Sequence, residues 1–134
     1  MSKKKILFIV NPISGTDKKR NIRRIIRENL DGERFEYKVK FTEYAGHAAE
    51  LAKEASAAGC DIVAAVGGDG TVNEVARSLT HSQAALGIVP CGSGNGLARH
   101  LQIPLDTAGA IRILNADTVR SLDYGIINGM PFFC

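Results

Sequence analysis

The sequence has few cysteines and no long hydrophobic run, and both absences narrow the class of protein. Its 134 residues, 45% of them hydrophobic, include Cys60, Cys91 and Cys134, which form no CxxC pair. This odd, widely spaced set argues against a disulfide framework and a zinc site, and it suits a reducing cytoplasm. The apolar run at residues 6–10 is too short for a signal peptide or a membrane span. We therefore expect a cytoplasmic protein with one compact domain.

Two common nucleotide-binding motifs are also missing. No stretch fits the GxxxxGK[ST] pattern of a P-loop. Neither glycine-rich loop completes GxGxxG, because Leu97 follows the glycines of residues 92–96, and Asn73 stands where the loop after Gly68 needs a third glycine. A Rossmann dinucleotide site is therefore disfavoured.

Positive charge is concentrated in the first part of the chain. Residues 1–40 hold twelve Lys/Arg against five Asp/Glu, residues 41–134 hold five against nine, and the net charge is only +3. In the helical pattern of residues 18–30, apolar residues share one face and the arginines face outward. Such a face is either simply solvated or suited to anions or a membrane surface. Nucleic acid is disfavoured, because neither a binding motif nor interleaved aromatic residues accompany the charge.

Nearly continuous apolar runs at residues 6–10, 61–66 and 85–89 are typical of strands buried on both faces of a parallel sheet. A weaker, alternating strand fits residues 35–41. Helical patterns lie between the strands, and the last of them follows a cap at Asp106 or Thr107. The order β-α-β-α-β-α-β-α-α-β predicts an open α/β fold with a mostly parallel sheet and helices on both faces. Near the end, SLDYGIINGMPFFC predicts a strand, an Asn-Gly hairpin turn and an apolar return strand.

Three loops that follow strands are rich in glycine and small polar residues: NPISG (11–15), GGDGTVN (67–73) and PCGSGNG (90–96). In open α/β sheets, ligands bind beyond the carboxyl ends of the strands. Glycine lets a ligand approach the backbone, while successive N–H groups and a helix N-terminus attract anions. Each loop alone has an ordinary explanation as a turn. Three of them at one edge of a sheet favour a phosphate site.

Residues 69–74 have competing interpretations. Thr71 and Glu74 match a capping box in which Thr71 caps the next helix and Glu74 reaches back. Asp69 fits either a turn or a functional carboxylate that holds Mg²⁺ against phosphates or accepts a proton from an attacking hydroxyl. Asp123, at the end of the last predicted strand, is a second carboxylate that we expect near the same edge.

Five segments in this order resemble the catalytic domain shared by diacylglycerol, ceramide and sphingosine kinases, and the resemblance covers essentially the whole chain. They are NPISG at 11–15, Thr42 with GHAAELAKEA at 46–55, VGGDGTVNEV at 66–75, IVPCGSGNGLAR at 88–99 and LDYGIINGMPFF at 122–133. GGDGT alone is shared with NAD kinases and phosphofructokinases, whose nucleotide-binding domains this fold resembles. The resemblance implies an ATP- and Mg²⁺-dependent kinase that phosphorylates a lipid hydroxyl at the membrane surface without spanning it.

By the same resemblance, the residues expected to contact ATP are Asn11, Pro12, Ile13, Ser14, Gly15, Thr42, Gly67, Gly68, Asp69, Gly70, Thr71, Val72, Asn73 and Ser93. Asp69 would support phosphoryl transfer, and the expected supporting residues are Arg20, Gly92, Gly94, Asn95 and Asp123. In bacterial diacylglycerol kinases the base and the main Mg²⁺ ligands lie in a second, mostly β domain. Residues 1–134 would then be the nucleotide-binding domain alone, and inactive by themselves.

The third loop departs from the usual bacterial pattern. Bacterial diacylglycerol kinases usually read GTGND there, whereas this chain reads GSGNG at 92–96, which leaves a diacylglycerol and a sphingoid substrate both open. The oligomeric state is also open, a homodimer included. Two other functions remain: a kinase for a soluble substrate, as in NAD kinases, and a regulatory protein that binds nucleotide without catalysis.

Overall fold

The chain folds around one six-stranded sheet. A computed structural model describes residues 3–12, 15–80, 82–90, 107–116, 119–122 and 125–128, and in residues 15–20, 119–122 and 125–128 the backbone alone. The sheet order is β2-β1-β3-β4-β6-β5, parallel except for the β5–β6 pair. The strands are β1 (Lys4–Val10), β2 (Phe35–Phe41), β3 (Ile62–Gly67), β4 (Ala85–Pro90), β5 (Val119–Leu122) and β6 (Gly125–Asn128).

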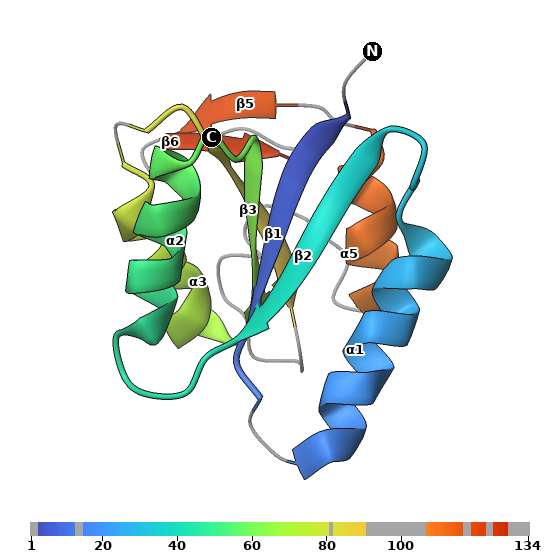
Figure 1. Ribbon diagram of the computed structural model, residues 1–134. Coiled ribbons are helices and arrows are strands. Elements are labelled where there is room, and N and C mark those ends of the chain that lie inside the picture. Colours follow the sequence, from blue (N-terminus) through green and yellow to red (C-terminus); the bar gives the residue numbers. More distant parts are fainter. Residues whose placement is uncertain are drawn as a thin grey trace.

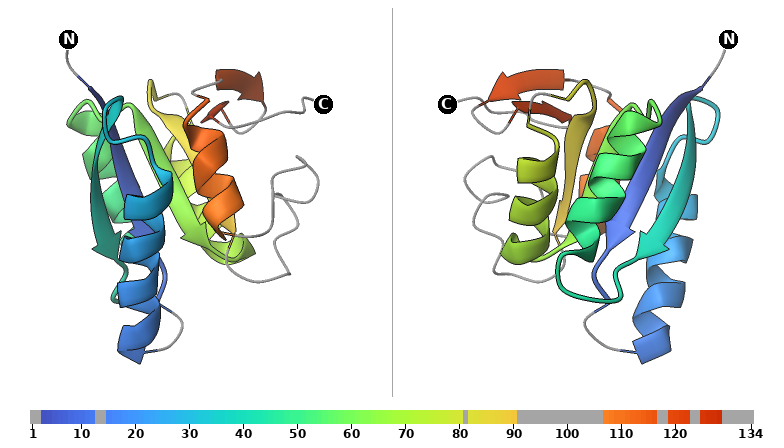
Figure 2. Two further views of the ribbon diagram at one scale, coloured as in Figure 1. Left: turned by 90° about the vertical axis from the view of Figure 1, so that its right-hand side faces the viewer. Right: turned by 60° about the vertical axis from the view of Figure 1, so that its left-hand side comes forward.

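Helices cover both faces of this sheet, as the sequence predicts. One layer holds α1 (Gly15–Asn29) beside α5 (Thr107–Leu114), and the other holds α2 (His47–Ala57) beside α3 (Asp69–Ser78) (Figures 1 and 2). The central strands are apolar throughout because both of their faces are covered: all six residues of β3 and of β4 are buried. The predicted open, three-layer α/β fold is confirmed.

Helix α1 separates its apolar and basic residues as predicted. Ile22, Ile26 and Leu30 are buried in the core, whereas Arg23 and Arg24 are exposed. Each of the other helices likewise buries apolar side chains, such as Leu51 in α2, against the sheet. Helix positions three or four apart point the same way, so one stripe per helix is enough to bind it to the sheet.

The predicted capping box at Thr71 is wrong. Helix α3 begins at Asp69, and its N-cap is Gly68, in an extended conformation and without a side-chain cap. Glu74 therefore lies more than one turn inside the helix, too far from the N-cap to bond to it. Its Oε1 instead accepts a hydrogen bond from the backbone N–H of Ala49, 3.3 Å away in α2. Glu74 ties two neighbouring helices together rather than closing one helix end.

The end of the chain also differs from the prediction. The strand expected at SLDYGIIN is two strands, β5 and β6, which pair antiparallel with Leu122 opposite Gly125. Asn128, the first residue of the predicted Asn-Gly turn, is the last residue of β6, and residue 129 lies outside the described residues. The predicted return strand and the first helix of the predicted α-α pair lie outside the described residues.

A hydrogen-bonded cluster joins α1 to α5 at the amino edge of the sheet. The side-chain oxygen of Asn115 accepts a hydrogen bond from the Asp31 N–H, and its amide donates to the Asn29 carbonyl, both at 2.8 Å. The Arg34 guanidinium donates to the Asn115 carbonyl, and Arg112 donates to the Asn29 side chain. One asparagine thus satisfies two backbone groups just beyond the end of α1.

Replacing this asparagine tests the importance of the cluster. We expect Asn115→Ala to lower the free energy of unfolding by about 1–3 kcal/mol, because it leaves two partly buried backbone groups without partners. Urea denaturation measures the change, with the exposed Lys53→Ala as a control expected to change stability by less than about 0.5 kcal/mol. Equal stability of the two variants would contradict this role of Asn115.

Candidate functional site

Three parallel strand ends meet in one row at the carboxyl edge of the sheet. Val10 lies opposite Phe41 on one side and Val66 on the other. The hydrogen-bond ladder continues beyond the strands, since the Asn11 N–H donates to the Val66 carbonyl (3.1 Å) and the Thr42 N–H donates to the Val10 carbonyl (2.9 Å). Asn11, Thr42 and Gly67 therefore lie side by side, although they are far apart in sequence.

The strand ends support the predicted convergence of the three glycine-rich loops. Pro90, the last residue of β4, lies opposite Gly67. The loop after β4 thus starts at the same edge as the loops after β1 and β3. Seven of the predicted site residues lie outside the described residues: Ile13, Ser14, Gly92, Ser93, Gly94, Asn95 and Asp123. Of Gly15 and Arg20, only the backbone, in α1, is described.

The residues on either side of Asp123 lie at the opposite edge of the sheet from the edge where the sequence predicts Asp123. Leu122 and Gly125, on either side of residues 123–124, lie near the amino ends of the parallel strands, since β6 pairs with β4 through Ile127 opposite Leu86. β5 and β6 accordingly lie across the sheet from the glycine-rich loop after β3 (Figure 1). The direction of β5 accounts for this position. β5 runs antiparallel to β6 and therefore ends near the amino ends of the parallel strands.

Gly67 packs tightly against Thr71. A Cβ on Gly67 would lie 3.0 Å from Oγ1 and 3.2 Å from Cβ of Thr71, whose side chain is buried over this turn. The neighbouring Val72 side chain is fully buried in the core, so a ligand could reach Val72 only through its backbone. Gly67, Thr71 and Val72 thus form the support of the loop.

Gly70 has no such internal reason, whereas Gly68 is the N-cap of α3, a position where glycine is preferred to alanine. A Cβ on either would meet nothing within 4 Å, and neither has a positive φ. Glycine at a helical position such as Gly70 costs about 1 kcal/mol relative to alanine. The chain therefore keeps a destabilising residue whose only structural effect is to leave open space in front of the backbone.

The start of α3 directs its backbone into this space. The first bond within the helix runs from the Val72 N–H to the Gly68 carbonyl, and a helix N-terminus presents the backbone N–H groups of its first turn to the space in front of it. A helix N-terminus of this kind attracts anions. The exposed Asp69 is the first residue of the helix.

A cavity of about 340 Å³ adjoins this loop. Asn11 and Pro12 line it after β1, residues 42–45 line it after β2, and Ala48, Thr71 and Glu74 line it from α2 and α3. Sequence analysis predicts Asn11, Pro12, Thr42 and Thr71 here but misses Glu43, Tyr44 and Glu74. Glu74 is missed because the sequence pattern explains it as a capping residue. The exposed Tyr44 is missed because it belongs to no recognised motif.

Tyr44 is held by two side chains at the rim of this cavity. Its ring stacks on His47, with centroids 4.3 Å apart and planes 15° apart, and its hydroxyl donates a hydrogen bond to Glu50. His47 is itself fixed, because the Glu43 N–H donates to its Nδ1 at 2.9 Å. The bond to Glu50, together with desolvation and the nearby carboxylates, raises the pKa of Tyr44.

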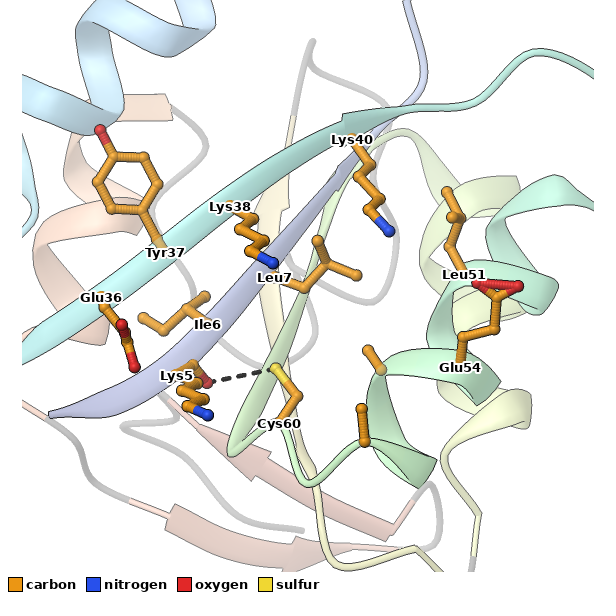
Figure 3. A pocket seen from close by; sticks show the side chains of 12 residues that line it. Lys5, Ile6, Leu7, Glu36, Tyr37, Lys38, Lys40, Leu51, Glu54 and Cys60 are labelled. Atoms are coloured by element: carbon orange, nitrogen blue, oxygen red, sulfur yellow. Dashed lines mark hydrogen bonds between the residues drawn. The ribbon is translucent and has the colours of Figure 1, made fainter. Parts of the chain in front are cut away.

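A larger cavity, of about 430 Å³, lies away from the glycine-rich loops. It is a groove on the sheet face between β2 and α2, with Lys38 and Lys40 reaching over it from β2 and Leu51 and Glu54 from α2 (Figure 3). Cys60 lies in its wall and donates to the Lys5 carbonyl, and burial raises the pKa of its thiol. The groove has neither a glycine loop nor a helix N-terminus, so we place the candidate site at the smaller cavity.

Neither a membrane span nor a complete metal centre is found in the described part of the chain. None of its helices combines the length and the hydropathy needed to cross a bilayer. Within the same residues, no three His, Cys, Asp or Glu side chains converge as metal ligands. Asp69 could still share a cation with a bound phosphate, because Mg²⁺ commonly takes only one or two protein carboxylates.

The fold and this edge define an α/β domain with a glycine-rich loop at a helix N-terminus beside a polar cavity. Residues 5–127 match the diacylglycerol kinase catalytic domain, and the chain belongs to that family. It is 41% identical over 132 residues to a Streptococcus pneumoniae protein named as a lipid kinase, covering 96% of this chain and 45% of that protein. It is 34% identical over 137 residues to the diacylglycerol kinase of Bacillus subtilis, covering 96% of this chain and 44% of that enzyme.

The fold agrees with this assignment. A crystal structure of a diacylglycerol kinase from Bacillus anthracis superposes with a TM-score of 0.75 at 23% identity, over 94% of this chain and 45% of that one. The present chain therefore spans less than half the length of the relatives that it matches.

The three glycines should respond differently to alanine. We expect Gly67→Ala to lower the free energy of unfolding by about 1–3 kcal/mol, because the new methyl group would overlap Thr71. Gly70→Ala should raise it by up to about 1 kcal/mol, because alanine is the better helix former and meets nothing. Thermal unfolding of both variants checks the two signs, with Gly68→Ala expected between them. A destabilised Gly70→Ala would show that this glycine has an internal role.

Proposed function

We propose that this chain is the nucleotide-binding domain of an ATP-dependent lipid kinase, which transfers the γ-phosphoryl group of ATP to a lipid hydroxyl. The observation that carries the proposal is the open space that Gly68 and Gly70 leave at the N-terminus of α3. Neither packing nor a positive φ explains Gly70, whereas a phosphate against the helix N-terminus does. Membership of the diacylglycerol kinase catalytic domain family supports the same function.

In this proposal each part of the edge has one task. The N–H groups of residues 69–71 bind the phosphates, while Asn11 and Thr42, held in register with Gly67, orient the nucleotide. Mg²⁺ bound with the phosphates supplies positive charge that offsets their negative charge during transfer. Asp69 holds that cation against the phosphates or accepts the proton of the attacking lipid hydroxyl. Positioning and charge neutralisation of this kind account for most catalysis in phosphoryl transfer.

The lipid substrate places the enzyme at the membrane surface. The exposed Arg23, Arg24 and Arg27 give α1 a basic side. We propose that this side of the helix faces phosphate or anionic lipid. Arg23 also lies over the ring of Phe41, with 5.1 Å between its guanidinium carbon and the ring centroid. We further propose that a second, mostly β domain, as in bacterial diacylglycerol kinases, supplies the base and the remaining metal ligands.

Replacing Asp69 tests the catalytic part of this proposal. In the complete protein we expect Asp69→Asn to lower kcat for lipid phosphorylation by roughly two to four orders of magnitude, as for loss of a catalytic acid or base. ATP binding should weaken much less, because the glycines and N–H groups remain. Radiolabel transfer from ATP to diacylglycerol and to sphingosine, with isothermal titration of ATP, measures both effects and identifies the lipid.

Asp61 offers a matched control at the other end of the same strand. Asp61 is exposed, and its side chain accepts a hydrogen bond from the Lys5 N–H, which an asparagine oxygen can also accept. Asp61→Asn should therefore leave kcat unchanged. Lipid phosphorylation by Asp69→Asn at the wild-type rate would exclude the role given to Asp69. ATP binding by the wild type without transfer to any lipid would favour the regulatory alternative.

A further inference from the structure

The cavity beside the glycine loop has the wrong charge for phosphate. Two carboxylates, Glu43 and Glu74, line it, and among the described residues around it there is no lysine or arginine. A polyphosphate there would be repelled, whereas groups that donate hydrogen bonds would be favoured. If the phosphates of ATP lie at residues 68–71, the acidic cavity is left for the base and ribose, which carry N–H and O–H donors.

A hydrogen bond also holds the Glu74 side chain in place. Its Oε1 is bonded to the Ala49 N–H, which links α3 to the first turn of α2. The glycine loop precedes α3, and Tyr44 precedes α2, so this bond links the two sides of the cavity. A nucleotide that spans from the loop to the cavity would meet a preorganised site.

Tyr44 provides the aromatic surface of this cavity. Its side chain is 55% exposed, an unusual state for a large aromatic residue that is nevertheless held by a ring stack and a hydrogen bond. Tyr44 lines the cavity, and His47, stacked on it, is not among the lining residues. The ring is thus stacked on a residue that does not line the cavity, while more than half of the Tyr44 side chain stays exposed. Fixing an exposed aromatic ring in this way lowers the entropy that a stacking partner would lose.

From this arrangement we infer that the base of the nucleotide stacks on Tyr44, with the ribose beside Glu74 and the phosphates at the start of α3. This inference rests on the proposed function and deepens it, because it assigns a residue for base recognition outside the glycine loops. His47 and Glu50 are positioning residues, since they act on the base only through the Tyr44 ring.

The test compares ATP with inorganic tripolyphosphate, which has the phosphates but no base. We expect Tyr44→Ala in the complete protein to weaken ATP binding about tenfold, the scale of losing one stacked base, and to leave tripolyphosphate binding unchanged. Tyr44→Phe keeps the ring and the His47 stack, so it should bind ATP within about twofold of the wild type. Isothermal titration with both ligands measures these differences.

Tyr37→Ala is the matched control. Tyr37 is the other large hydrophobic side chain that is exposed among the described residues, at 38%, and it packs edge-on against Phe8 on β1, outside this cavity. Its replacement should leave the affinity for ATP unchanged. Thermal unfolding of each variant confirms that it is folded under the conditions of the titration.

The outcomes separate the inference from the proposed function. A wild type that binds neither ATP nor tripolyphosphate would overturn the proposed function and the inference with it. A wild type that binds ATP while Tyr44→Ala binds it equally well would overturn the inference alone. So would an equal loss of ATP and tripolyphosphate in Tyr44→Ala, because that would place the effect on the phosphate loop.

Discussion

The parallel pairing of β1 with its two neighbours is the constraint on which the candidate site depends. Val10 is paired with Phe41 and with Val66, and the ladder continues into Asn11 and Thr42. A shift of one residue would move each side chain of β1 to the opposite face of the sheet. The packing of the core therefore fixes this register. The same register brings three loops to one edge, and the packing of the core thereby sets the geometry of the site.

The glycines of the loop after β3 differ in their surroundings. Gly67 packs tightly against Thr71, while Gly68 and Gly70 face open space. Gly67 keeps the strand close to its helix, Gly68 is the N-cap of α3, and Gly70 costs stability without any gain in packing. Glycines next to one another in a short motif can thus have different surroundings, and only the surrounding atoms distinguish them.

Charge separates the two ends of the candidate site. The start of α3 attracts anions, whereas the cavity beside it holds Glu43 and Glu74. A ligand with a charged end and a neutral, donor-rich end fits this gradient in one orientation only. The bond from Glu74 to the Ala49 N–H keeps the two regions together. The proposed orientation of the nucleotide rests on this difference in charge.

The sequence by itself determined the elements, because apolar runs and helical stripes record which faces are buried. It also determined the edge of the glycine loops, since parallel strands end together. Tertiary structure alone decided where α3 begins, what Glu74 bonds to and how the chain turns between β5 and β6. Each of these depends on residues from distant segments, as does Asn115 bonding near the end of α1. Such partners leave no periodic trace in the sequence, because the fold and not the local pattern brings them into contact.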